Sequence, residues 1–96
     1  MVMAGLFPLK SQKTMTKSHI KHRARQELKR IRRQELGMSI AEFAELLNVS
    51  WYTVQAWEGG QRNVIAPTML SLWWNGNLEA SRIAGKIFQK AFEGWP

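Results

Sequence analysis

Two histidines and three glutamates are the residues whose types could support metal binding or acid–base catalysis. His19 and His22 are three residues apart, but no carboxylate or thiol accompanies them and their surroundings are cationic. Glu42, Glu45 and Glu58 could act as acids or bases, yet no nucleophile with an adjacent base can be assembled from this sequence. We therefore expect no metal, no cofactor and no enzymatic activity.

The basic residues of the chain are concentrated in its first third. The net charge is +7, with ten basic residues and one acid from Lys10 to Arg33, against four basic residues and six acids from Gln34 onward. This clustering favours binding to a polyanion, because phosphate contacts release condensed counterions. A solvated tail that only aids solubility would explain the charge alone equally well.

Length and composition indicate a single domain of 96 residues that can bury a core, since 45% of its residues are hydrophobic. The sequence has no long apolar run and no secretory signal at its start. It also has no cysteine, which removes disulfides and thiolate metal sites. We expect a cytoplasmic protein that does not enter a membrane.

The spacing of apolar residues predicts helices after a flexible basic arm. Residues 1–18 mix glycine, proline, lysine, serine and threonine without a period, as expected of an arm. A stripe of apolar residues from Ile20 to Leu36 predicts the first helix, and Gly37 supplies a left-handed residue to end it. Ser39 with Glu42 forms a capping box for a second helix.

A turn at residues 48–49 separates this second helix from a third. Ser50 is the expected cap, the helix runs from Trp51 to Glu58, and two glycines at 59 and 60 end it. Pro67 suits the first turn of a fourth helix. In that helix we expect one apolar face of Met69, Leu70, Trp73 and Trp74.

A fifth helix over residues 78–92 is the most amphipathic segment. Its apolar stripe is expected to pair with a second copy of the chain, and consists of Ile83, Ile87, Phe88 and Phe92. The alternative is a helix that packs into the core of its own chain.

The run from Ser39 to Gly60 resembles the helix-turn-helix of the Cro and phage-repressor family. In that family an arginine near the end of the first helix precedes a Leu-Gly pair, a buried alanine lies in the second helix, and an aromatic residue, Glu and Gly end the recognition helix. The matching residues here are Arg33, Leu36-Gly37, Ala44 and Trp57-Glu58-Gly59-Gly60. The resemblance covers roughly residues 28–74 and departs at Ile40, where the family commonly has a phosphate-contacting glutamine.

The resemblance implies an all-α fold, a five-helix helix-turn-helix domain that binds double-stranded DNA. We expect a basic arm over residues 1–18, the DNA-binding domain over 19–77 and a dimerisation helix over 78–96. The resemblance also implies a partly buried, structural ion pair between Arg33 and Glu58. The loop after Gly60 is longer than usual, so its phosphate contacts transfer only to Arg62, with Gln61 and Asn63 as helpers.

Burial of Val49, Val54 and Trp57 between helices would leave the opposite face of the third helix to enter a major groove. Gln55 is the best candidate for reading a base, because its amide can donate to and accept from adenine. Trp51 and Tyr52 would contact thymine methyls or phosphate, although both could instead be core residues. The expected DNA-binding residues are Ser39, Ser50, Trp51, Tyr52, Gln55, Ala56, Arg62 and Asn63.

The sequence thus predicts a dimeric, autoregulatory transcriptional repressor whose arm and first helix add phosphate contacts. Short regulators of this kind resemble those of phages and mobile elements, including anti-CRISPR-associated and antitoxin groups. One alternative is an antitoxin that neutralises a toxin through the last helix and binds DNA secondarily. Another is an RNA-binding adaptor that depends on the basic arm.

Overall fold

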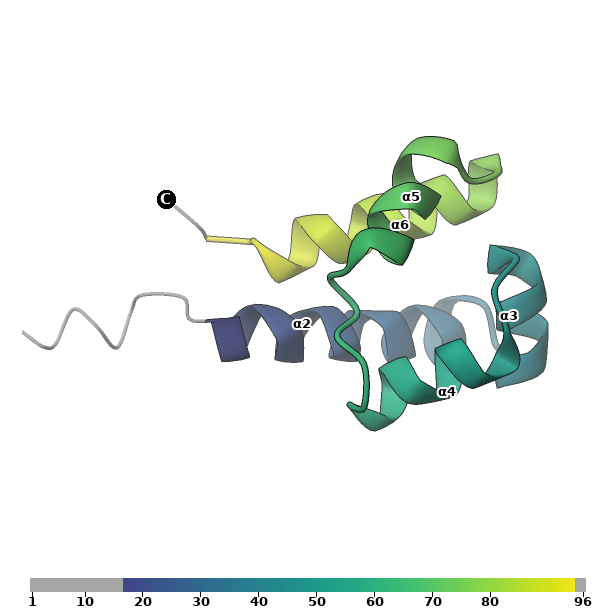
Figure 1. The fold of residues 1–96 in the computed structure, drawn as a ribbon, viewed down its shortest axis with the longest axis horizontal. Helices are drawn as coiled ribbons and strands as arrows, with labels where there is room; N and C mark the ends of the chain where they lie inside the picture. Colours follow the sequence, from purple (N-terminus) through teal and green to yellow (C-terminus); the bar gives the residue numbers. More distant parts are fainter. Residues whose placement is uncertain (1–16, 95–96) are drawn as a thin grey trace, which may run out of the picture.

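A computed structural model describes residues 17–94, and within this range the protein is all-helical, as the apolar spacing predicts. The elements in chain order are α2 (Lys17–Arg30), a π-helical turn η1 (Ile31–Glu35), α3 (Ile40–Leu47), α4 (Trp51–Gly59), α5 (Pro67–Asn75) and α6 (Leu78–Ala91) (Figure 1). The predicted arm lies outside the described residues except for its last two positions, which belong to α2. None of the described helices has the length and apolar character needed to cross a membrane.

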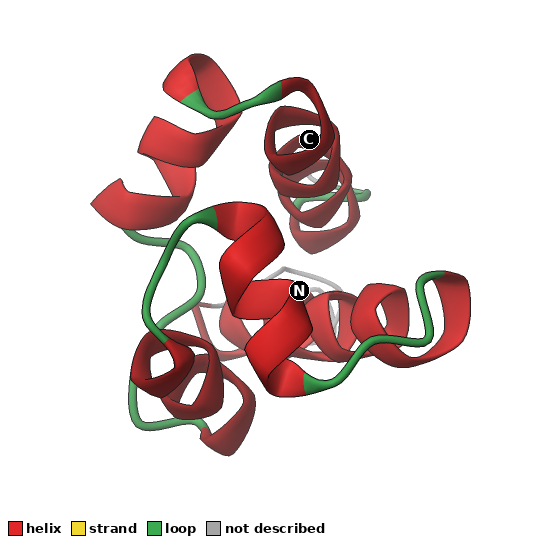
Figure 2. Cartoon of the chain, turned by 90° about the vertical axis from the view of Figure 1, so that its right-hand side faces the viewer, coloured by secondary structure: helices red, strands yellow, loops and turns green. Residues whose placement is uncertain are grey.

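The long helix α2 lies between α4 on one side and α5 and α6 on the other. Figure 1 shows α3 across the end of α2, where it packs against α4 and α6. The view from the α3 end in Figure 2 shows these helices joined by short loops. Helices packed on both sides of α2 allow one core to form around it.

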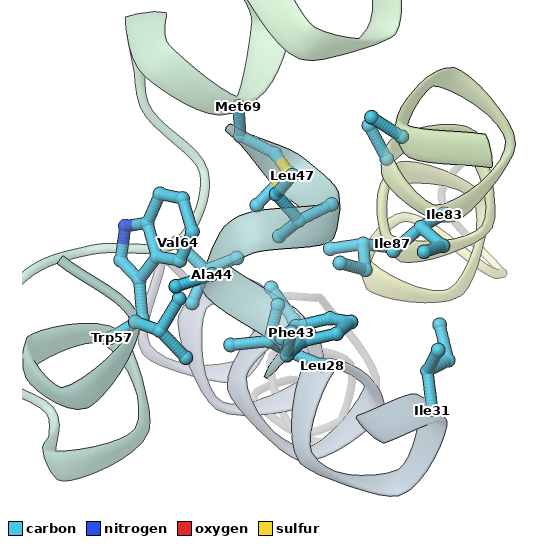
Figure 3. Close-up of a cluster of buried hydrophobic side chains, with 14 of the residues drawn as sticks. Leu28, Ile31, Phe43, Ala44, Leu47, Trp57, Val64, Met69, Ile83 and Ile87 are labelled. Atoms are coloured by element: carbon cyan, nitrogen blue, oxygen red, sulfur yellow. The ribbon is translucent and has the colours of Figure 1, made fainter. Parts of the chain in front are cut away.

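All five α-helices and η1 contribute to a single hydrophobic core. Trp57 of α4 and Phe43 of α3 are its largest fully buried side chains. Figure 3 shows them with further core residues, namely Leu28, Ile31, Ala44, Leu47, Val64, Met69, Ile83 and Ile87. Because one core joins both ends of the described chain, α4 is held by the same packing as α6.

The expectation that the α6 stripe pairs with a second copy is wrong for its two isoleucines. Ile83 is 3% exposed and Ile87 is 0% exposed, because α6 packs against α2 and turns its stripe into the chain's own core. Phe88 is partly buried and stacks on Trp73 of α5, with ring centroids 4.8 Å apart. Only Phe92, which is 38% exposed, reaches the surface substantially. The alternative of an intramolecular core helix is the one that the structure shows.

The expected apolar face of α5 is wrong at Trp74. Met69 is fully buried and Leu72 packs against the core, whereas Trp74 is 72% exposed. Five residues separate Met69 from Trp74, which is about 140° around an α-helix, so the two side chains cannot share a face.

Side-chain caps fix the starts of α3, α4 and α6. The capping box predicted for α3 is confirmed, since Ser39 Oγ accepts from the backbone N–H of Glu42 at 3.1 Å and Glu42 Oε1 accepts from the backbone N–H of Ser39 at 2.8 Å. Gly37 has the predicted positive φ of 59°. Asn77, which we had not expected as a cap, accepts from the Ala80 N–H at 2.8 Å and starts α6.

Candidate nucleic-acid interface

The turn between α3 and α4 is short and is held by backbone hydrogen bonds. Asn48 adopts the left-handed conformation at φ 59°, and the next residue, Val49, donates its backbone N–H to the carbonyl of Ala44 at 3.0 Å. Ser50 then caps α4 by accepting from the backbone N–H of Thr53 at 3.0 Å, as the sequence predicts. These bonds set the direction in which α4 leaves α3.

The outer face of α4 consists of uncharged, hydrogen-bonding side chains. Trp51 is 48% exposed, Tyr52 is 64% exposed and Gln55 is also exposed. On the inner face, Val54 and Trp57 are almost completely buried. At about 100° per residue, the exposed side chains lie on one contiguous arc of the helix. The exposure expected for these three residues is therefore confirmed.

Ala56 does not belong to this outer face, contrary to expectation. It is 5% exposed, because the chain after α4 folds back across it. The backbone N–H groups of Gln61 and Arg62 both donate to the carbonyl of Ala56, at 2.9 and 3.2 Å. Gly60, with φ 85°, makes this reversal possible. Ala56 is a packing residue at the edge of the arc.

Glu58 forms the expected buried ion pair, but its partner is Arg32 and not Arg33. Arg32 donates to both carboxylate oxygens of Glu58, through Nε at 2.5 Å and Nη2 at 2.9 Å, and donates through Nη1 to the carbonyl of Met38 at 2.7 Å. Both side chains are about one-tenth exposed. These bonds raise the pKa of Arg32 above its usual value, mainly through the hydrogen bonds to Glu58.

The correction follows from helical phase. Arg33 lies one residue, or about 100°, beyond Arg32, and its side chain is exposed to solvent. Arg32 instead lies seven residues after Arg25, about two turns along the same face of the helix. Both therefore point to α4, and Arg25 donates through Nε to the backbone carbonyl of Glu58 at 2.8 Å.

Arg25 was not predicted from the sequence, although its spacing of seven residues from Arg32 indicates that both lie on the same face of the helix. The two arginines bind the side chain and the main chain of the same residue, Glu58, near the C-terminal end of α4. With the Ser50 cap at the other end, α4 is held at both termini. A helix fixed in this way presents its outer face in one orientation.

The remaining predicted binding residues lie in different surroundings. The guanidinium of Arg62 lies over the ring of Tyr52, 5.9 Å from its centroid, which joins the loop after α4 to the outer face of α4. Asn63 Oδ1 accepts from the backbone N–H of Ile65 at 3.1 Å and shapes that loop. Ser39 and Ser50 are exposed, and their hydroxyl oxygens serve as helix caps.

No group of three or more potential metal ligands occurs among residues 17–94. Glu42, which caps α3, and Glu58, which pairs with Arg32, have structural partners. Glu45 lies exposed on α3. The three glutamates therefore occupy three separate settings and do not form a catalytic group.

Comparisons of the chain with protein-family models, with curated proteins and with solved structures found no match. The feature of the molecule that bears on function is therefore the outer face of α4, with Arg62 beside it. The one acidic residue of α4, Glu58, is buried and paired, so the exposed part of this helix carries no negative charge.

Proposed function

We propose that the protein is a sequence-specific, double-stranded-DNA-binding regulator of the helix-turn-helix type that places α4 in the major groove. The observation that carries the proposal is the rigidly anchored α4, whose outward arc of Trp51, Tyr52 and Gln55 bears no acid. A major groove about 12 Å wide admits one α-helix, and a helix held at both ends can present the same side chains to each base pair.

Each exposed side chain of the arc has a distinct part in this proposal. The amide of Gln55 would donate to and accept from one adenine, which is the interaction that carries sequence information. Trp51 and Tyr52 have apolar rings for thymine methyl groups and an N–H or O–H for phosphate oxygens. Arg62, adjacent to Tyr52, would contact the backbone at the edge of the groove.

The α6 helix has no part in this proposal. The alternative in which the last helix grips a toxin depended on a free stripe that includes Ile83 and Ile87, and both residues are buried within the chain. The same burial removes them from any interface between two copies. Binding to RNA through the basic residues remains a competing outcome, which the experiment below separates from binding to duplex DNA.

Selection of duplexes from a random library tests the proposal directly. The full chain should enrich a defined DNA sequence, and the enriched duplex should compete better than a random duplex or an RNA of equal length at two salt concentrations. Equal competition by all three nucleic acids would reject sequence-specific DNA binding.

Replacement of Gln55 with alanine assigns the base contact. We expect Gln55→Ala to reduce the preference for the enriched over the random duplex by about 1 to 3 kcal/mol, because the paired amide contacts disappear. Gln89 is an exposed glutamine on α6 and provides a matched control, so Gln89→Ala should bind as the wild type does. Equal loss of affinity for both duplexes in Gln55→Ala would remove this residue from the base-reading role.

A further inference from the structure

An open cationic cavity of about 230 Å³ lies between α2 and the loop that follows α4. One wall is a stripe of α2 that contains Lys21, His22 and Arg25, and the other is the loop after α4, which contributes Arg62 and Asn63. Lys21 and Arg25 are four residues apart, which places both side chains on the same face of α2. Residues of the two walls that are 37 positions apart or more, such as Arg25 and Arg62, thus meet around one hollow.

The charge of this cavity is unbalanced. Lys21, Arg25 and Arg62 give it three positive charges, and none of the described residues that line it is acidic. Two carboxylates lie two residues along the chain from a lining residue, and both are paired, Glu58 with Arg32 and Glu27 with Arg30. Three cations around one water-accessible hollow repel one another unless an anion joins them.

The cavity also holds one of its cations in place. Arg25 is fixed by its Nε bond to the Glu58 carbonyl, and its guanidinium has four further N–H groups on the two terminal nitrogens. The guanidinium lies beside Gly60, where a Cβ would be 3.4 Å from Nη1 of Arg25, an ordinary contact distance. A fixed guanidinium fork matches the oxygens of a phosphate group better than a freely moving cation does.

The hydrogen-bond donors and the volume of the cavity also suit a phosphate group. Ser18 contributes a hydroxyl and His22 a ring N–H, and both residues are exposed at the cavity. At about 30 Å³ for each water in the liquid, the volume corresponds to roughly eight water molecules, which is room for a phosphate group with some of its hydration.

We propose that this cavity, bounded by Lys21, Arg25 and Arg62, is a phosphate-binding pocket. In the DNA complex it receives one phosphate of the backbone next to α4, and this assignment of the source depends on the proposed function. The contact between Arg62 and Tyr52 joins the pocket to the outer face of α4. A phosphate held there sets the position of the duplex along α4 and carries no sequence preference of its own.

The first arm of the test uses inorganic phosphate without DNA. Phosphate is titrated against chloride at equal ionic strength, and the backbone amide resonances of Gly60, Asn63 and Val64 are followed by NMR. Saturable shifts in the wild type, weakened several-fold in Lys21→Gln, would establish a site for free phosphate. Arg82→Gln makes the same charge change on α6, across α2 from α4 in Figure 1, and should leave the titration unchanged.

The second arm uses random duplex DNA, so that it does not depend on sequence preference. Each phosphate contact contributes a slope of about 0.9 to the dependence of log affinity on log salt. Between 50 and 200 mM salt, Lys21→Gln should therefore lose about 3.5-fold less affinity than the wild type. On a defined duplex, uncharged methylphosphonate at one backbone position should weaken the wild type and Arg82→Gln but have little effect on Lys21→Gln.

The outcomes separate the pocket from the proposed function. A lower salt slope on random duplex in Lys21→Gln, but not in Arg82→Gln, supports the backbone phosphate even if no sequence is preferred, and coupling to one methylphosphonate position identifies that phosphate where the duplex is bound in one register. Shifts with inorganic phosphate but no change in salt slope support a free phosphate compound as the source and overturn the DNA assignment. Absence of both effects, or equal effects in Arg82→Gln, overturns the phosphate pocket while leaving sequence-specific binding by α4 untouched.

Discussion

Removal of Arg32 should destabilise the protein far more than removal of its neighbour Arg33. The Arg32 guanidinium makes two hydrogen bonds to Glu58, and both side chains are about one-tenth exposed. Loss of one partner from a buried pair leaves an uncompensated charge and costs about 3 to 5 kcal/mol. Because small domains have a free energy of unfolding of about 5 to 15 kcal/mol, Arg32→Gln removes a large fraction of the total.

Urea denaturation followed by far-ultraviolet circular dichroism measures this difference. Arg33 is exposed, so Arg33→Gln should change the free energy of unfolding by no more than about 0.5 kcal/mol. The two variants make the same chemical change one residue apart, and Arg33→Gln therefore serves as a matched control. An equal loss of stability in both would refute the pairing of Arg32 with Glu58.

A double variant tests the physical reason for the loss. Replacement of both partners, as in Arg32→Met with Glu58→Leu, removes the isolated buried charge and should recover much of the stability lost in Arg32→Gln. If the double variant is less stable than Arg32→Gln, an unpaired charge is not the source of the destabilisation.

Two further predictions concern a helix cap and a surface carboxylate. Ser39→Ala removes the acceptor for the Glu42 N–H and should lower the free energy of unfolding by about 1 kcal/mol in the same urea assay, whereas no change would exclude a stabilising cap. Hydrogen bonds from Arg30 and Lys86 hold the pKa of Glu35 below its usual value of 4.5. The ionised Glu35 therefore contributes its full stabilisation above pH 4.5, and this contribution is lost as the pH falls through the lowered pKa. The difference in free energy of unfolding between the wild type and Glu35→Gln should shrink on acidification. A constant difference from pH 6 to pH 2 would contradict this prediction.

Local signals in the sequence were sufficient to place the helices around the candidate interface. Ser39 and Ser50 are caps whose side-chain oxygens act on backbone groups three residues away, so the local sequence contains both partners. The exposure of Trp51, Tyr52 and Gln55 follows from the phase of a single short helix. These features need no knowledge of distant parts of the chain.

Features that depend on distant segments were not predictable in the same way. Ala56 is buried by a loop that reverses at Gly60, and nothing in the α4 sequence indicates the path of that loop. The amphipathic stripe of α6 shows that its apolar side must be covered, but the same pattern suits a second copy or α2 equally well. Ile83 and Ile87 are covered by the chain itself.

The partner of Glu58 was misassigned for a different reason. The resemblance to a family placed an arginine by its distance from a Leu-Gly pair, which assumes an uninterrupted α-helix up to that pair. In this chain the helix changes at η1, where Leu36 donates its N–H to the carbonyl of Ile31, five residues earlier. A π-type turn of this kind contains more residues than an α-helical turn, and the sequence shows no clear sign of it.

The four tryptophans of the described chain differ in their optical environments. Trp57 is sealed in the core at 1% exposure, Trp51 lies on the outer face of α4 at 48%, and Trp73 and Trp74 of α5 are 39% and 72% exposed. A dissolved quencher such as iodide reaches the exposed rings and not Trp57. A chain in which phenylalanine replaces every tryptophan but Trp57 would therefore report on the integrity of the core, and one that keeps only Trp51 would report on occupancy of α4, without any attached dye.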